Sequence, residues 1–231
     1  MLEPRETMPT TARRMRSDGE FYTDLFTWII LTCMATDWQI ETRTPAARSI
    51  LTTAGRIFYE RGISAVGVDA LAAEAGVTKK TLYDQFGSKA ALVTAYLTER
   101  DQHYRAWIEH EMQDKEPKAQ ILSVFDALDS WMDAHSTKGC AFVHAHGELL
   151  GSPDHPAHDV IRDEKVWLRT LFVDLAAAAE LERPESLGTQ LLALLEGATV
   201  LRSIMGRTGA VAEARAAAHA LIESDPLVRA R

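Results

Sequence analysis

Apolar residues recur at spacings of three and four along most of the chain, which is the period of a helix with one buried face. From residue 44 the pattern is regular. Thr44 can cap a helix, Pro45 suits its first turn, and an apolar stripe runs on to Arg61. The alternation of Val, Ile and Thr that is typical of strands is scarce. The pattern therefore predicts an all-α protein of about nine helices.

Two short helices are predicted in the segment Val68–Phe86. The first ends at Gly76, a residue that tolerates the left-handed backbone at a helix terminus. Thr78 then caps a second helix, in which Leu82 and Phe86 lie four residues apart and face inward. A helix, a tight turn and a second short helix together predict a helix-turn-helix.

Longer helices are predicted after this segment. Ser88 caps a connector helix that proline stops at Pro117. Five more are expected at 118–134, 140–150, 156–181, 184–205 and 210–224. We accordingly expect three parts: an N-terminal extension at 1–42 that is disordered or an overlong start, a three-helix domain at 43–92 that contains the helix-turn-helix, and a further helical domain at 93–231.

Charge is distributed unevenly along the chain. The whole chain has a formal charge of −8, but residues 43–100 hold eight basic and five acidic groups, a net charge of +3. A basic module inside an acidic chain is the pattern expected when one face meets phosphates.

Two cysteines, Cys33 and Cys140, are too few and too far apart to suggest a disulfide framework, so a cytoplasmic protein is expected. The one apolar run, residues 25–35, is shorter than the roughly 20 residues that a membrane helix needs. We expect no membrane partner and no cofactor.

The second helix of the helix-turn-helix carries the side chains suited to DNA. A major groove admits one α-helix, whose N-terminal side chains reach base edges and phosphates. Lysines suit phosphate or guanine, threonine hydroxyls suit phosphate, and a tyrosine can donate to a phosphate. The predicted DNA-binding residues are Thr78, Lys79, Lys80, Thr81, Tyr83 and, at the start of the next helix, Lys89.

At these residues the chain resembles the TetR (tetracycline-repressor-like) family. The matching positions are Gly62, Val68, Leu71-Ala72, Ala75-Gly76-Val77, Thr81-Leu82-Tyr83, Phe86, Ser88-Lys89 and Leu92. The resemblance covers about residues 45–100. It implies a DNA-binding domain at 43–92, in which the residues listed above face double-stranded operator DNA and Lys89 holds a phosphate. It also implies an effector-binding and dimerisation domain at 93–231, which forms a homodimer through its last two helices and encloses a ligand pocket.

The chain departs from the family pattern at three positions. Val66 and Gly67 replace the threonine or serine that many members carry before the first helix of the motif. Asp84 puts a negative charge on the DNA-facing helix, and we expect it to orient Lys80.

An effector pocket is expected in the C-terminal part, because aromatic walls with a few polar groups are typical of ligand cavities. The candidate lining residues are Trp131, His135, Cys140, His144, His146 and Trp167. The sequence thus predicts a regulator, in the first place a repressor released from its operator by a small-molecule effector.

The sequence also allows two other kinds of control and one other class of protein. A regulator of this fold could respond to thiol oxidation at Cys140 or to a protein partner. A helical enzyme using the Cys/His cluster is a distant alternative, for no hydrolase or metalloprotease motif is present. We expect no catalytic residue and no metal site, since no compact ligand motif occurs.

Overall fold

The computed structural model describes residues 13–15, 21–23 and 43–225. The helices are α3 (Pro45–Arg61), α4 (Val68–Glu74), α5 (Lys79–Phe86), α6 (Lys89–Met112), α7 (Pro117–His135), α8 (Ala141–Leu149), α9 (Ala157–Ala178), α10 (Pro184–Met205) and α11 (Ala210–Ser224). The all-α prediction is confirmed for residues 43–225. Among these residues no helix is long and apolar enough to cross a membrane.

Two three-residue strands precede the helices. β1 (Arg13–Met15) pairs antiparallel with β2 (Phe21–Thr23), in a register that places Arg14 opposite Tyr22. The rest of the 1–42 extension lies outside the described residues, so the expectation of a disordered or overlong start stays a prediction.

Local signals explain where several helices begin. Thr44 Oγ1 accepts a hydrogen bond from Ala47 N at 3.1 Å at the start of α3. Ser88 Oγ likewise accepts from Ala91 N at 3.0 Å at the start of α6. Proline occupies the first turn of α7 and of α10, where its missing N–H costs nothing.

Two apolar cores are present, and α6 contributes to both. Its N-terminal half places Leu92 and Leu97 in a core with α3, α4, α5, α8 and the start of α9. Its C-terminal half places Tyr104 and Ile108 in a second core with α7, α9, α10 and α11. The first core extends past residue 92, and the domain boundary proposed there stays a prediction.

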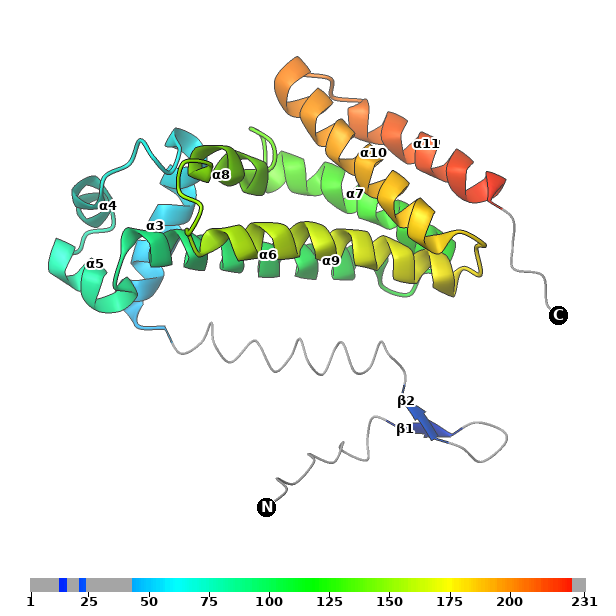
Figure 1. Cartoon of the computed structure of the whole chain (residues 1–231), viewed down its shortest axis with the longest axis horizontal. Helices are drawn as coiled ribbons and strands as arrows, with labels where there is room; N and C mark the ends of the chain where they lie inside the picture. Colours follow the sequence, from blue (N-terminus) through cyan, green and yellow to red (C-terminus); the bar gives the residue numbers. More distant parts are fainter. Residues whose placement is uncertain (1–12, 16–20, 24–42, 226–231) are drawn as a thin grey trace. The chain divides into compact units, whose positions relative to one another are not determined.

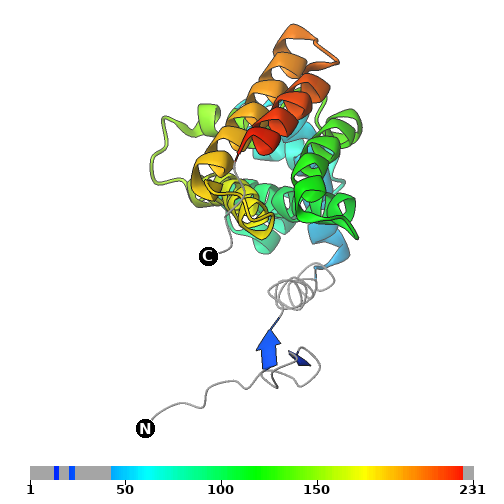
Figure 2. The same cartoon turned by 90° about the vertical axis from the view of Figure 1, so that its right-hand side faces the viewer.

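The second core is a bundle in which α9 packs on α10 and α10 on α11 (Figure 1). Figure 2 shows α10 and α11 lying side by side when the molecule is turned. Gly188 permits the close approach of α9 and α10, since a Cβ at this position would lie 2.4 Å from Val173 Cγ2. Leu191, Leu195 and Ala198 of α10 are buried within this single chain.

Candidate nucleic-acid interface and ligand cavity

The turn between α4 and α5 is held by backbone and side-chain contacts. Gly76 has a φ of +70°, and Val77 N donates to Ala72 O at 3.0 Å, which closes the end of α4. Ser49 of α3 donates from Oγ to Ala75 O at 2.9 Å. Because Leu71 and Leu82 are fully buried, the two helices keep a fixed angle.

Five of the six predicted DNA-binding residues lie together on α5 and its cap. Thr78 is the N-cap and accepts from Thr81 N at 3.1 Å. Thr78, Lys79, Lys80 and Tyr83 are exposed, while Leu82 of the same helix has no exposed surface. The helix therefore presents one polar face to solvent.

The charged side chains of this face pair with neighbouring acids. Lys79 Nζ lies 2.9 Å from Asp69 Oδ1, and this contact raises the pKa of Lys79. Lys80 Nζ lies 2.7 Å from Asp84 Oδ2, one turn away. Asp84 therefore contacts Lys80, while its expected role in orienting this lysine stays a prediction. Exposed pairs contribute little free energy, so phosphates can replace these carboxylates at low cost.

Lys89, the sixth of the predicted DNA-binding residues, lies on α6 and contacts the protein backbone instead of an acidic side chain. Its Nζ donates to Ile63 O at 2.6 Å and lies 6.0 Å from the centre of the Phe58 ring. Desolvation lowers the pKa of Lys89. The side chain is thus bonded to the loop before α4, and its phosphate contact stays a prediction.

Gly67 occupies the N-cap of α4 and makes no side-chain capping bond there. Val66, the residue before it, is buried. The position at which relatives were expected to present a hydroxyl therefore offers only backbone N–H groups.

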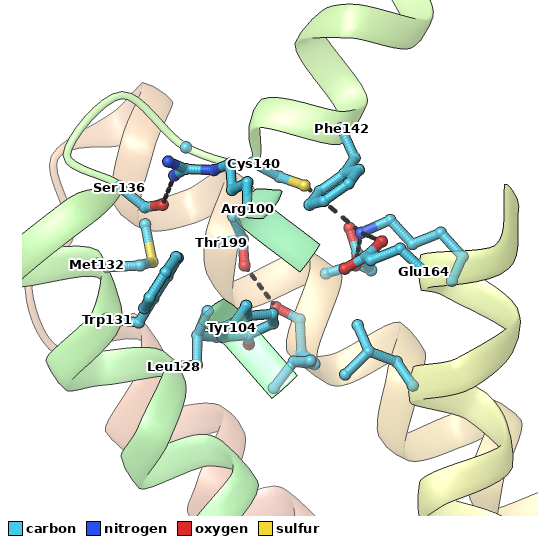
Figure 3. Close-up of a pocket in the computed structure, with 15 residues that line it drawn as sticks. Arg100, Tyr104, Leu128, Trp131, Met132, Ser136, Cys140, Phe142, Glu164 and Thr199 are labelled. Carbon is cyan, nitrogen blue, oxygen red and sulfur yellow. Dashed lines mark hydrogen bonds and ion pairs between the residues drawn. The ribbon is translucent and has the colours of Figure 1, made fainter. Parts of the chain in front are cut away.

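A cavity lies between α6, α7, α8, α9 and α10 (Figure 3). Its apolar and aromatic lining residues are Tyr104, Leu128, Trp131, Met132, Phe142, Leu168 and Leu195. Its other lining residues are Arg100, Ser136, Gly139, Cys140, Glu164, Lys165, Glu196 and Thr199. Trp131 and Glu164 lie on opposite sides of the cavity in this view.

The charged groups of the cavity are concentrated at α9. Lys165 Nζ lies 2.6 Å from Glu196 Oε1 and 3.0 Å from Glu164 Oε2. Burial raises the pKa of Glu164 to about 7, although Lys165 opposes the shift. Those two carboxylates raise the pKa of Lys165 and keep it charged, against the effect of burial.

Arg100 occupies another part of the lining. Its guanidinium donates to His135 O at 2.9 Å and to Ser136 Oγ at 2.5 Å. The guanidinium carbon lies 4.7 Å from the centre of the Tyr59 ring and 5.4 Å from that of Trp131. Two rings and two oxygens thus hold Arg100 in place.

The structure brings only part of the predicted pocket set together. Trp131 and Cys140 line the cavity. His135 packs its ring against Trp131 at 4.5 Å and is exposed, and Trp167 lies under the guanidinium of Arg105 at 4.5 Å; neither lines the cavity. His144 and His146 are exposed on α8 and do not line it either. Their predicted roles as ligand contacts have no support from this geometry.

Sequence reasoning missed Tyr104, Glu164, Lys165 and Glu196. The sequence pattern could have singled out Glu164, because this residue falls in the apolar stripe of α9 between Ile161 and Leu168. In the structure its side chain is 2% exposed. A carboxylate on the buried face of a helix is rare without a partner or a function. Glu196 and Lys165 gave no such signal, because half-buried charges look like ordinary surface residues.

Helix α8 connects the cavity to the helix-turn-helix. It starts after Cys140, and Glu148 near its end accepts hydrogen bonds from Ile63 N at 2.9 Å and Ser64 N at 2.6 Å. These two bonds and the charge of Lys89 lower the pKa of Glu148 against the effect of burial. The peptide of Ile63 is therefore held by Glu148 on its N–H and by Lys89 on its carbonyl.

The loop before α8 is bonded to α3 in the same manner. Tyr59 Oη donates to Gly139 O at 2.9 Å and accepts from Lys138 N at 2.8 Å. Lys138 Nζ donates to Glu60 O at 2.6 Å. Both ends of α8 thus contact the C-terminal end of α3 or the loop that follows it.

No group of three or more His, Cys, Asp or Glu side chains that could hold a metal ion occurs among the residues that the structure describes. His158 lies near two other histidines, with its ring centre 6.2 Å from that of His146 and 6.4 Å from that of His155.

Comparisons with known proteins agree with this geometry. The family model described as bacterial regulatory proteins, tetR family, matches residues 50–96. An uncharacterised HTH-type transcriptional regulator of Mycobacterium tuberculosis (strain H37Rv) is 43% identical over 63 residues, which cover 27% of this chain and 31% of that protein. The match thus spans about a third of this relative's length.

Solved structures extend the likeness beyond the helix-turn-helix. A TetR-family transcriptional regulator from Streptomyces coelicolor is 28% identical with a TM-score of 0.73, covering 81% of this chain and 93% of that one. A putative TetR transcriptional regulator from Streptomyces avermitilis is 27% identical with a TM-score of 0.64, covering 76% and 98%. A regulator from Legionella pneumophila, at 16% identity and a TM-score of 0.67 over 78% and 98%, shares the fold.

The helix-turn-helix, joined by α6 and α8 to a helical bundle with an internal cavity, defines the class of helix-turn-helix transcriptional regulators. Residues 50–96 match the TetR family of bacterial regulatory proteins, and the described helices share the fold of a TetR-family transcriptional regulator. This is a family of regulators and not of enzymes.

Proposed function

We propose that this protein is a homodimeric repressor that inserts α5 into the major groove of its operator and is released by a small-molecule effector. One observation carries the DNA-binding part. Thr78, Lys79, Lys80, Thr81 and Tyr83 form one polar face on a helix whose opposite side is anchored by the fully buried Leu82. The acids that pair with the two lysines are exposed and can give way to phosphates.

The DNA-binding part is tested with the Lys80→Ala variant on DNA from the region upstream of the gene. Loss of one phosphate contact lowers the affinity and reduces the salt slope by about one. Lys118→Ala is the matched control, because this lysine also pairs with an exposed acid but lies on α7. Wild-type protein that binds no such fragment contradicts the proposal.

The dimer is proposed to form through α10 and α11. One face of α10 is buried within the chain, but four large apolar side chains near its end are exposed: Val200 at 47%, Leu201 at 39%, Ile204 at 79% and Met205 at 64%. Such a patch marks an interaction surface, and a two-fold axis through it satisfies both copies. For the two copies to occupy successive major grooves, the axis must place the two α5 helices about 34–36 Å apart, one DNA turn.

Light scattering on the Ile204→Glu variant tests the dimer. A buried charge at the interface is expected to yield monomers that bind a palindromic operator far more weakly. Val166→Glu is the control, since Val166 is similarly apolar and 56% exposed but lies on α9. An Ile204→Glu protein that remains dimeric refutes this interface.

Effector control is proposed to act through α8 and α6. Cys140 and Phe142 line the cavity at the start of α8, and Glu148 holds the loop before α4 at its end. A ligand that displaces α8 therefore moves the helix-turn-helix, while α6 turns with it as a lever. Thermodynamic linkage requires that operator DNA weaken effector binding by the same factor.

Glu148→Ala tests this route. Without the carboxylate, amide hydrogens at Ile63 and Ser64 are expected to exchange faster and effector response to fall, while the cavity still binds ligand. Glu182→Ala, an exposed acid after α9, is the control. Unchanged exchange and unchanged response exclude this route.

A second candidate signal is oxidation of Cys140. Its Sγ lies 3.5 Å from Lys165 Nζ, an interaction that favours the reactive thiolate, whereas burial raises the pKa of the thiol. Peroxide would convert the thiolate to a sulfenic acid. If Cys140→Ser leaves the peroxide sensitivity of operator binding unchanged, this candidate is excluded.

In either case the protein is proposed to act in the cytoplasm, because its operator DNA is there.

A further inference from the structure

Two buried polar atoms in the cavity make no hydrogen bond. They are Tyr104 Oη on α6 and Glu164 Oε2 on α9, in residues that are 6% and 2% exposed. Glu164 Oε2 does lie 3.0 Å from Lys165 Nζ, but as an ion pair whose angles do not make it a hydrogen bond. Unsatisfied buried polar atoms are rare in proteins, and both of these line the same cavity.

The charges around Glu164 leave one negative charge without a cation. Lys165 is shared between Glu164 and Glu196. On the facing helix α6, Asp101 is matched by Arg105, with Nη2 and Oδ2 2.7 Å apart. From α8 the facing titratable group is the Cys140 thiol, which burial keeps neutral.

Arg100 does not supply the missing cation. Its guanidinium is bonded to His135 O and Ser136 Oγ and lies against the rings of Tyr59 and Trp131. No ion pair between Arg100 and a carboxylate is present among the described residues. The carboxyl of Glu164 therefore lacks a full counterion, which agrees with its pKa of about 7.

The rest of the lining suits a cation with an apolar body. Trp131 and Tyr104 have ring centres 5.1 Å apart, and Phe142 adds a third ring. The face of an aromatic ring attracts cations, most strongly when water is excluded. Leu128, Met132 and Leu168 supply apolar surface around these rings.

We propose that this cavity binds a lipophilic amine, whose protonated nitrogen donates hydrogen bonds to Glu164 Oε2 and Tyr104 Oη while its apolar body packs against Trp131 and Phe142. The assignment of this ligand as the effector rests on the proposed function. Binding supplies the missing positive charge and satisfies both orphaned atoms.

A ligand that accepts hydrogen bonds gives the opposite pH dependence. It needs the protonated form of Glu164, so its affinity falls as the pH rises through about 7. An amine needs the carboxylate, so its affinity rises over the same range for as long as the amine stays protonated. The sign of the pH dependence therefore separates the two ligand classes.

The test compares three probes with one ring and different charge: 2-phenylethylamine, 2-phenylethanol and phenylacetate. Each is titrated into the full-length protein without DNA by calorimetry, with the fluorescence of Trp131 as a second signal. We expect the amine to bind about tenfold or more tightly than the alcohol near pH 8, and phenylacetate to bind most weakly. Amine affinity is expected to rise from about pH 6 to about pH 8.

Two variants locate the amine. Glu164→Gln keeps the shape of the side chain and is expected to abolish the preference for the amine over the alcohol. Tyr104→Phe removes only the hydroxyl and is expected to weaken amine binding several-fold. Glu213→Gln, an exposed acid on α11, is the control, and circular dichroism confirms that each variant is folded.

An amine that binds no better than the alcohol, or that binds more weakly as the pH rises, overturns the proposal. The proposal is also overturned if the preference for the amine over the alcohol persists in both Glu164→Gln and Tyr104→Phe. The effector role is measured separately, by adding 2-phenylethylamine to the operator complex. Binding with the expected pattern but without release supports the ligand class and contradicts only the effector role.

Discussion

Helix α5, the proposed recognition helix, and the cavity each contain a lysine–carboxylate ion pair, but in opposite surroundings. On α5, Lys80 is paired with Asp84, and their side chains are 84% and 53% exposed. In the cavity, Lys165 is paired with Glu164, which is 2% exposed. Water and salt screen the first pair, so that phosphate can take the place of the acid. The second pair is held in place because the Glu164 carboxylate alone would be buried without a cation.

The first expected effect of this difference is on stability, in the Lys165→Met variant. Removing the cation leaves Glu164 and Glu196 side by side without compensation. We expect the free energy of unfolding to fall by about 2–3 kcal/mol, less than for a fully buried pair because Lys165 is 27% exposed. Urea denaturation measures it.

The double variant Glu164→Gln/Lys165→Met is the control, because it removes one acid together with the cation. It is expected to regain part of the lost stability. A Lys165→Met protein as stable as wild type would show that the buried pair contributes no more to the free energy of unfolding than an exposed pair.

The second prediction concerns the pH dependence of stability. The pKa of Glu164 is raised from 4.5 to about 7, so between these values the folded protein holds a proton that the unfolded chain has released. Stability relative to the Glu164→Gln variant is therefore expected to decrease from about pH 4.5 to about pH 7, by up to about 1.4 kcal/mol per unit, and to be level above. Thermal or urea denaturation over this range, with Glu182→Gln as the exposed control, tests the sign. A difference that increases with pH contradicts it.

Thr78 is expected to show a smaller effect. Its hydroxyl caps α5 by accepting from Thr81 N, so Thr78→Ala is expected to lower the free energy of unfolding by about 1 kcal/mol. Thr78→Ser retains the capping oxygen and is expected to remain close to wild type. Equal losses in both variants would show that the methyl group matters and not the cap.

Asp84→Asn is expected to have the smallest effect, and only on DNA binding. The change frees Lys80 and removes a negative charge from the helix proposed to face DNA, so operator affinity is expected to rise roughly twofold to fivefold, most at low salt. Denaturation is expected to show no measurable change, because an exposed pair contributes little. Asp159→Asn on α9 is the control. Weaker binding by Asp84→Asn would mean that the pair itself positions Lys80 for DNA.

The sequence alone was sufficient for the helix-turn-helix. Thr44, Thr78 and Ser88 are caps, and Gly76 ends α4, as their residue types predict. Such features depend on residues within a turn or two of one another. The polar face of α5 follows in the same way, because the 3.6-residue period decides which side chains lie opposite Leu82.

The tertiary structure alone decided the cavity and its chemistry. Tyr104, Glu164 and Glu196 come from three helices far apart in the sequence, and their meeting depends on how α6, α9 and α10 pack. The same holds for Lys89, whose ammonium is bonded to Ile63 O although the motif suggested a phosphate contact. A local pattern fixes which way a side chain points from its own helix. The packing of the helices determines what it meets, and that interaction sets whether a charge is screened by water or buried beside another charge.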